Sequence, residues 1–232
     1  MHTDHVSAPA VRRTRAKRGS GDLLRNEIVV AAKRLLAEAE SADDVPMRAV
    51  ADAVGVTTPS IYLHFADKQE LLGAVVADVF RELDDAMLEG AAAETTPLGR
   101  LRAFGLAYVR FALAHPEHYR LAMLDPCPKP NVEVDEVLHS AGFSHMQATV
   151  EECIASGVFQ GEPLAITFEM WAAAHGVAAL MIAKPYLPFG DAEEFADRAL
   201  CAAALGHAVR PMLGDDPSPG VVTAWLAGHV PQ

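Results

Sequence analysis

Gly55 is the residue that most constrains how this chain can fold, because it separates two short stretches with helical spacing. Before it, Val50, Ala51 and Val54 recur on one face of a predicted helix. Glycine tolerates the left-handed backbone that ends a helix and opens a tight turn. Residues 46–65 are therefore predicted to form two short helices joined by a glycine-centred turn.

The second of these helices is predicted to be anchored on one side and exposed on the other. Ile61 and Phe65 lie four residues apart and share one face. Thr57 and Thr58 are suited to capping the helix, and Pro59 is suited to its first turn. The other faces carry hydroxyl, phenol and imidazole groups. This pattern is typical of a helix-turn-helix, in which the first helix holds the second as it enters the major groove of DNA.

The same segment resembles the DNA-binding signature of the tetracycline-repressor (TetR) family. The matching string is RAVADAVGVTTPSIYLHFADK, residues 48–68. It combines an Ala-x-x-x-Gly turn, a Tyr-x-His-Phe ending and a following lysine, and the resemblance extends over roughly residues 21–83. It implies an all-α protein in which a long helix joins an N-terminal three-helix DNA-binding domain to a C-terminal helical ligand-binding and dimerisation domain.

Seven side chains in this segment are predicted to contact DNA. They are Arg48, Thr57, Thr58, Ser60, Tyr62, His64 and Lys68. Arg48 is expected to pair with a phosphate, as its counterpart does in the family, and Lys68 is expected to fix the register on the backbone. The hydroxyls can face base edges or phosphates. The alternatives are that the threonines serve only as caps and that His64 is a packed, half-buried ring.

The sequence departs from the family pattern at one place. Pro46 and Met47 stand where the family usually offers a hydroxyl at the start of the first of the two helices. Proline suits a first turn, so the helix is still expected. A phosphate contact is lost there, which places more weight on Arg48.

Residues 1–20 are predicted to form a disordered basic arm, because they hold five Lys and Arg side chains and no apolar periodicity. Such arms can follow phosphates or enter the minor groove. The alternative is a solvated tail that only aids solubility.

A long helix is predicted on each side of the helix-turn-helix. The first spans about residues 22–39, and its apolar stripe consists of Leu24, Ile28, Ala31 and Leu35. Its Arg25 and Lys33 are interpreted as surface charges. The second spans about residues 67–90 and opens with a capping box of Asp67 and Glu70. Its stripe consists of Leu71, Leu72, Val75, Val79 and Leu83.

Helical spacing continues through a second domain, predicted over residues 84–214, and residues 215–232 are interpreted as a C-terminal tail. The helices of this domain are predicted at about 97–114, 117–124, 132–157, 163–183 and 191–212, and a proline-rich loop at 125–130.

The last two of these helices carry stripes of small residues. In residues 163–183 the stripe consists of Ala172, Gly176, Ala179 and Ala183, and in residues 191–212 of Ala199, Ala203 and Gly206. The helix at 163–183 also has a stripe of large residues, and a helix that is apolar on two faces must be buried on both. Two such helices from each of two chains are predicted to form the isologous interface of a homodimer.

Aromatic and methionine side chains of the second domain are candidates for binding a largely apolar effector. They are Phe104, Tyr108, Phe143, Met146, Phe168, Trp171 and His175. Residues 171–176 also resemble the Trp-x-x-x-His-Gly (WHG) motif of one type of TetR C-terminal domain. The alternative is that all of these side chains belong to the core, with His175 satisfied inside it.

The formal charge of −12 for the whole chain is unfavourable for binding to DNA, but the charge is unevenly distributed along the sequence. Residues 1–68 hold 10 Lys and Arg against 9 Asp and Glu, whereas the remaining residues hold 9 against 22. Attraction to phosphate depends on where the basic groups lie, so the acidic second domain does not exclude DNA binding.

The three cysteines, Cys127, Cys153 and Cys201, are widely spaced and predict neither a disulfide framework nor a zinc site. We expect them to be buried, with redox sensing by Cys127 as the alternative. No signal-peptide pattern opens the chain, and apolar runs of about 18 residues are interrupted by polar residues. These features predict a cytoplasmic protein with no membrane partner, no metal and no cofactor.

No hydrolase, metalloprotease or phosphate-loop motif occurs in the sequence, so we expect no enzymatic activity. The sequence predicts a homodimeric transcriptional regulator, most simply a repressor. It would bind a palindromic operator in double-stranded DNA and be released by a small, largely apolar ligand in the C-terminal domain. The alternative is a helical protein-interaction adaptor that has lost DNA recognition. Intact Tyr62, His64 and Lys68 argue against that alternative.

Overall fold

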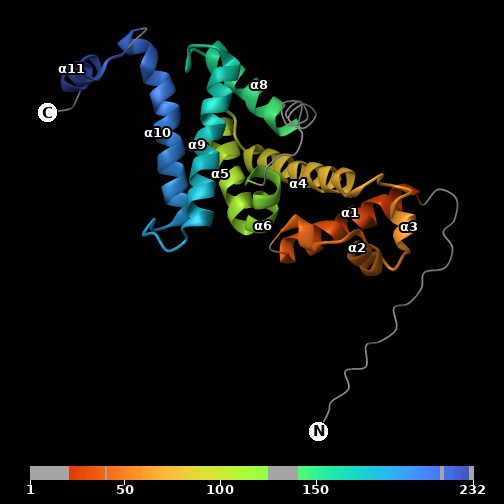
Figure 1. Ribbon diagram of the computed structural model, residues 1–232. Coiled ribbons are helices and arrows are strands. Elements are labelled where there is room, and N and C mark those ends of the chain that lie inside the picture. Colours follow the sequence, from red (N-terminus) through yellow and green to blue (C-terminus); the bar gives the residue numbers. More distant parts are fainter. Residues whose placement is uncertain (1–20, 40, 125–140, 215–216, 230–232) are drawn as a thin grey trace. The chain divides into compact units, whose positions relative to one another are not determined.

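The computed structural model describes residues 21–39, 41–124, 141–214 and 217–229, and all regular structure within these ranges is helical (Figure 1). The α-helices are α1 Gly21–Glu38, α2 Met47–Val54, α3 Thr58–Ile61, α4 Lys68–Ala91, α5 Pro97–Ala114, α6 Pro116–Tyr119, α8 Ala141–Ala155, α9 Pro163–Ala183, α10 Ala192–Val209 and α11 Pro219–His229. Shorter turns are η1 Ala42–Asp44, η2 Arg120–Leu124, which is π-helical, and η3 Arg210–Leu213. The predicted all-α fold class is confirmed. Predictions for the basic arm, the 125–130 loop, Cys127 and the start of the 132–157 helix lie outside the described residues.

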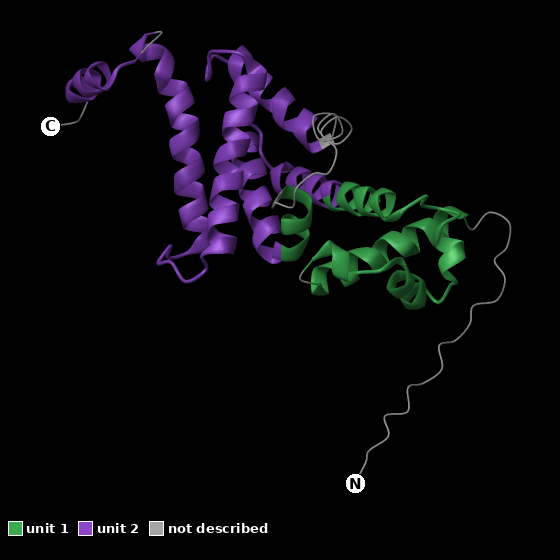
Figure 2. Cartoon of the chain, in the orientation of Figure 1, with its two compact units in different colours: residues 1–79, 117–125 green, residues 80–116, 126–232 purple. Residues whose placement is uncertain are grey.

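The chain divides into two compact units (Figure 2). Unit 1 comprises residues 1–79 and 117–125, and unit 2 comprises residues 80–116 and 126–232. The sequence predicted a division at residue 83 and kept 117–125 in the second domain. The structure places residues 117–125 with unit 1. Leu121 packs against the core of unit 1, and Arg120 Nη2 donates a hydrogen bond to the Ala39 carbonyl at 3.4 Å.

The core of unit 1 joins α1 to the two short helices and to the start of α4. Its fully buried members include Ile28, Ile61, Phe65 and Val75, and Val50 is almost fully buried. The predicted stripe on α1 was partly wrong, because Leu24, Ala31 and Leu35 are only half-buried. The buried positions of α1 are Ile28, Val29, Ala32, Lys33 and Leu36.

Lys33 was wrongly interpreted as a surface charge. Its Nζ lies 2.6 Å from Asp78 Oδ2 of α4, and the two side chains are only 11% and 13% exposed. The buried face of α1 therefore includes the position next to Ala32, which a purely apolar pattern does not predict. Arg25, in contrast, is exposed as expected.

Helix α4 begins with the predicted cap. Asp67 Oδ1 accepts a hydrogen bond from the Glu70 N–H at 2.9 Å, while Glu70 Oε2 accepts from the Ala66 N–H at 2.6 Å. The returning bond therefore reaches one residue further back than a standard capping box. Of the predicted stripe, Leu72 is half-buried, and the buried members are Leu71, Val75, Val79 and Leu83.

Helix α9 is the central element of unit 2, where it packs against α5, α8 and α10 (Figure 1). Among the described residues it is the one helix long and apolar enough to span a membrane, with 39% of that window buried. The packing on three helices accounts for its apolar composition in the way expected of a core helix. Phe143, Val150, Phe159 and Met170 are buried in the core to which it contributes.

One face of α9 and α10 is open within a single chain. Ala172, Gly176 and Gly206 are exposed, and no atom lies within 4 Å of a Cβ built on either glycine. Cys201, expected to be buried, is exposed on α10, whereas Cys153 is fully buried. Burial raises the pKa of the Cys153 thiol to about 11, so it remains protonated.

The segment predicted only as a C-terminal tail contains helix α11, which has no buried residue.

Candidate nucleic-acid interface

The turn between α2 and α3 depends on Gly55. This residue has φ 78° and ψ 31°, the left-handed conformation predicted for it. Its N–H donates to the Ala51 carbonyl at 3.0 Å, and the Val56 N–H donates to the same carbonyl at 3.0 Å. These bonds satisfy the free carbonyl end of α2 and direct the chain into α3.

The recognition segment, residues 57–64, is less regular than predicted. Helix α3 ends at Ile61, and residues 62–64 form a turn in which the His64 N–H donates to the Ile61 carbonyl at 2.8 Å. The Phe65 N–H donates to the same carbonyl at 3.0 Å, so Phe65 still lies on the inner side. Ile61 and Phe65 are both 0% exposed, and together they anchor the segment as expected.

The outer side of the recognition segment is polar. Tyr62 is 50% exposed and Thr57 is exposed, while Thr58, Ser60 and His64 are half-buried. Thr57 occupies the N-cap position without a side-chain bond to a backbone N–H. Its Oγ1 lies instead 2.8 Å from Ser60 Oγ, so the two hydroxyls are held as a pair.

Leu63 is a surface residue that the sequence reasoning missed. It is 84% exposed and stands between Tyr62 and His64 in the outward turn. Its place between two residues already assigned to the outer side was the available signal. An exposed apolar side chain here suits contact with a thymine methyl group.

Within the described residues, the two cations predicted to contact phosphate take part in long ion pairs at the surface. Arg48 Nε lies 3.8 Å from Asp52 Oδ2, one turn along α2. Lys68 Nζ lies 3.9 Å from Asp43 Oδ1. Exposed pairs of this kind contribute little free energy, so either cation can exchange its carboxylate for a phosphate.

The predicted effector residues fall into a buried set and a partly exposed set. Phe104, Tyr108, Phe143 and Met146 are buried, whereas Trp171 and His175 are half-buried and Phe168 is exposed.

Two groups of contacts join these side chains. The Phe143 ring centroid lies 5.2 Å from that of Phe168 and 6.1 Å from that of Trp171. The Tyr108 hydroxyl accepts from Trp171 Nε1 at 3.4 Å and lies 3.3 Å from His175 Nδ1. Burial lowers the pKa of His175, which keeps its imidazole neutral at pH 7.

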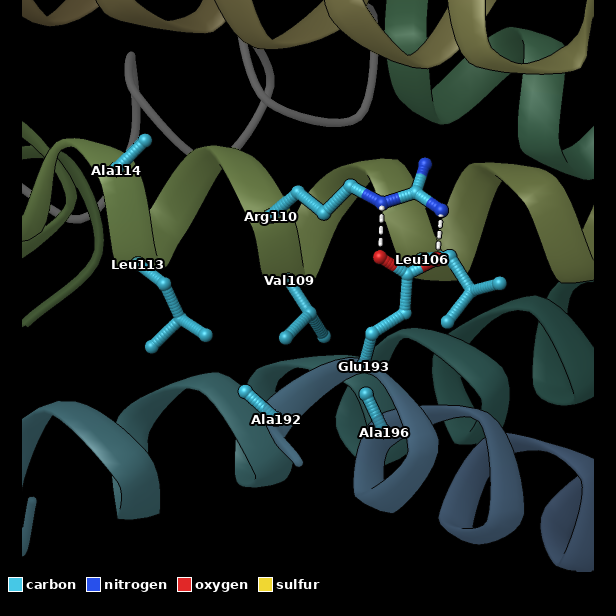
Figure 3. A pocket seen from close by; sticks show the side chains of 8 residues that line it. All are labelled: Leu106, Val109, Arg110, Leu113, Ala114, Ala192, Glu193 and Ala196. Carbon is cyan, nitrogen blue, oxygen red and sulfur yellow. Dashed lines mark hydrogen bonds and ion pairs between the residues drawn. The ribbon is translucent and has the colours of Figure 1, made fainter. Parts of the chain in front are cut away.

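A separate recess of about 300 Å³ lies between α5 and α10 (Figure 3). Most of the residues that line the recess are apolar. The exceptions are Arg110 and Glu193, which form an ion pair in which Arg110 Nε donates to Glu193 Oε2 at 3.1 Å. The hydrogen bond from Arg110 lowers the pKa of Glu193. None of the seven predicted effector residues lines this recess.

In the described part of the chain, no group of three or more His, Cys, Asp and Glu side chains is arranged to hold a metal ion. The site is instead a helix-turn-helix with a buried apolar anchor and an exposed polar side, which defines a DNA-binding protein of the helix-turn-helix class.

Family comparisons agree with this class. Residues 28–75 match the model of the bacterial regulatory proteins of the tetR family, and residues 101–203 match the tetracyclin repressor-like C-terminal domain. Because both domains match, the chain belongs to the tetR family, whose members are DNA-binding transcription regulators. Among proteins with curated descriptions, none matches this sequence.

Solved structures share the fold over most of their length. A protein of unknown function from Rhodococcus sp. RHA1 is 29% identical, with a TM-score of 0.69 over 80% of this chain and 95% of its own. A putative tetR-family transcription regulator from Shewanella sp. PV-4 is 18% identical, with a TM-score of 0.67 over 81% and 99%. A tetR-family transcription regulator from Marinobacter aquaeolei VT8 is 20% identical, with a TM-score of 0.65 over 83% and 99%.

Proposed function

We propose that this protein is a homodimeric repressor that acts in the cytoplasm, binds a palindromic operator and is released by a small, largely apolar effector. The observation that carries the proposal is the recognition segment itself. Its inner side is fixed by two fully buried side chains, Ile61 and Phe65, and its outer side presents a phenol, hydroxyls and an exposed leucine. A structural role alone does not require that combination.

The recognition segment is proposed to read the major groove. Tyr62 and the paired hydroxyls of Thr57 and Ser60 are placed to donate and accept hydrogen bonds, and Thr58 and His64 flank them. The two cations of the site, Arg48 and Lys68, then hold the protein on the phosphate backbone.

A palindromic operator requires two copies of this segment related by a two-fold axis. The open face of α9 and α10 supports such a dimer. It exposes small residues beside Leu180 and Leu205, which are 44% and 56% exposed. Burying this face against a second copy would remove apolar surface from water and let the helices approach closely.

The effector is proposed to contact the aromatic cluster of unit 2, where Phe168, Trp171 and His175 retain exposed surface. A neutral His175 beside the Tyr108 hydroxyl offers a polar contact in otherwise apolar surroundings. Resemblance to the Trp-x-x-x-His-Gly type stays a prediction, since the matched model describes only a tetracyclin repressor-like C-terminal domain. Such a ligand would release DNA to the extent that it prefers the conformation that binds DNA poorly.

The test is to incubate the full chain with fragments of its source genome, sequence the bound fraction and measure affinity for the enriched fragment. The proposal expects an inverted repeat whose half-sites lie about one helical turn apart, roughly 34–36 Å. Enrichment of no fragment, or of fragments that share no repeat, would reject it. Light scattering of the free protein and of the complex gives the number of chains bound.

A further inference from the structure

The ion pair of Lys33 and Asp78 joins α1 to α4 inside unit 1. The two groups are 2.6 Å apart and largely withdrawn from water. Desolvating two charges costs free energy that their attraction recovers only in good geometry, and apolar replacements of such pairs are often neutral or stabilising. What the pair adds to an apolar contact is direction, because the hydrophobic effect is non-directional whereas a charge-assisted hydrogen bond has a preferred geometry.

Helix α1 also contacts the recognition segment. About two turns before Lys33, the Arg25 guanidinium lies 4.8 Å from the ring centroid of Phe65, the residue that closes the segment. Between them, Ile28 is fully buried in the same core as Ile61. One helix therefore contacts both α4 and the base of the DNA-reading surface.

Asp78 lies on α4 close to the boundary between the two units. The division between the two units falls after Val79, so Asp78 lies in the last turn of α4 that belongs to unit 1. The helix itself continues to Ala91 in unit 2. Lys33 thus holds α4 immediately before the helix enters the other unit.

We propose that Lys33 and Asp78 are positioning residues for DNA recognition. Their pair sets the rotation of α4 against α1, and α1 in turn sets the orientation of residues 57–64. The inference rests on the proposed DNA-binding function, but neither residue is proposed to touch DNA.

The first experiment compares Lys33→Met with Arg34→Met, using the full-length protein and the genomic fragment that it selects. Both variants remove one positive charge from neighbouring positions on α1, so both change the long-range attraction to phosphate alike. Only Lys33 is buried against Asp78, whereas Arg34 is exposed. Lys33→Met is expected to weaken DNA binding by about tenfold more than Arg34→Met does. Equal losses would overturn the proposal.

The second experiment separates positioning from stability. Lys33→Met alone leaves a buried carboxylate, whereas the double variant Lys33→Met/Asp78→Leu leaves none, so its urea midpoint is expected to return to the wild-type value or above. Its DNA affinity is expected to stay about tenfold below wild type, because the directional contact is still missing. A double variant that recovers both properties would show that the pair is only structural.

A readout without DNA keeps this inference distinct from the proposed function. Nitroxide spin labels are attached through ketoxime links at positions 63 and 77, because Leu63 and Ala77 are both exposed and both lie in unit 1. Pulsed electron paramagnetic resonance then measures the distance between the recognition segment and α4. In labelled protein diluted with unlabelled chain, the distance distribution is expected to broaden in the double variant. An unchanged width would overturn the positioning role. If the wild-type protein selects no DNA while the double variant still shows the broadening, the proposed function is rejected and the geometric role is kept.

Discussion

Replacing Gly55 by alanine tests whether the turn between α2 and α3 governs the DNA-binding unit. At φ 78° and ψ 31° the added Cβ crowds the backbone, which costs about 1–2 kcal/mol. The unfolded chain loses entropy with the same substitution, which returns about 0.4–1 kcal/mol. The expected net loss in the free energy of unfolding of unit 1 is therefore about 1 kcal/mol.

Gly73→Ala is the matched control, since it makes the same change in the same unit. Gly73 lies in α4, its φ is not positive, and no atom lies within 4 Å of a Cβ built on it. Helix propensity there should favour alanine by about 1 kcal/mol, so the two variants should shift stability in opposite directions. Both changes in the free energy of unfolding can be measured by urea unfolding, with hydrogen exchange followed in peptides from residues 47–79. A Gly55→Ala protein as stable as Gly73→Ala would refute the argument from backbone strain.

The remaining predictions concern the interface, the dimer and pH. Tyr62→Ala should weaken operator binding without changing the urea midpoint, and a parallel loss of stability would make Tyr62 structural. Operator affinity should fall with salt, and Arg48→Gln should make the log–log slope shallower by about 2, since each of two protomers loses one phosphate contact. An unchanged slope would remove that role. Gly206→Leu should raise the dimer dissociation constant in analytical ultracentrifugation; an unchanged constant would move the interface elsewhere. Because burial lowers the pKa of His175, protonation favours the unfolded state, so stability should fall as pH drops below about 6.5, and His175→Gln should reduce that dependence. An identical pH dependence in His175→Gln would contradict this.

Signals confined to a few neighbouring residues predicted the structure well. Gly55 had to be left-handed because the residues around it end one helix and begin another, and Ile61 and Phe65 had to be buried because four-residue spacing places them together. The cap at Asp67 likewise depends on bonds within four residues. Each of these features is decided by backbone geometry over about one helical turn.

Prediction failed where the outcome depended on a distant partner. Lys33 looks like a surface lysine until Asp78, 45 residues away, is brought against it. Residues 117–125 have helical spacing like their neighbours, and tertiary contacts such as the packing of Leu121 and the hydrogen bond from Arg120 to Ala39 associate them with unit 1. The burial of the effector candidates also depends on tertiary packing, since Phe104 and Met146 are buried whereas Phe168 is 38% exposed.

The sequence by itself therefore determined the helical class of this protein, the site of its glycine turn and the face that anchors its recognition segment, because these follow from local periodicity and backbone preference. The tertiary structure decided which charges are buried, where the chain divides into units and which small-residue faces stay open to a partner. Those properties depend on burial and pairing between residues far apart in the chain, and no local pattern encodes them.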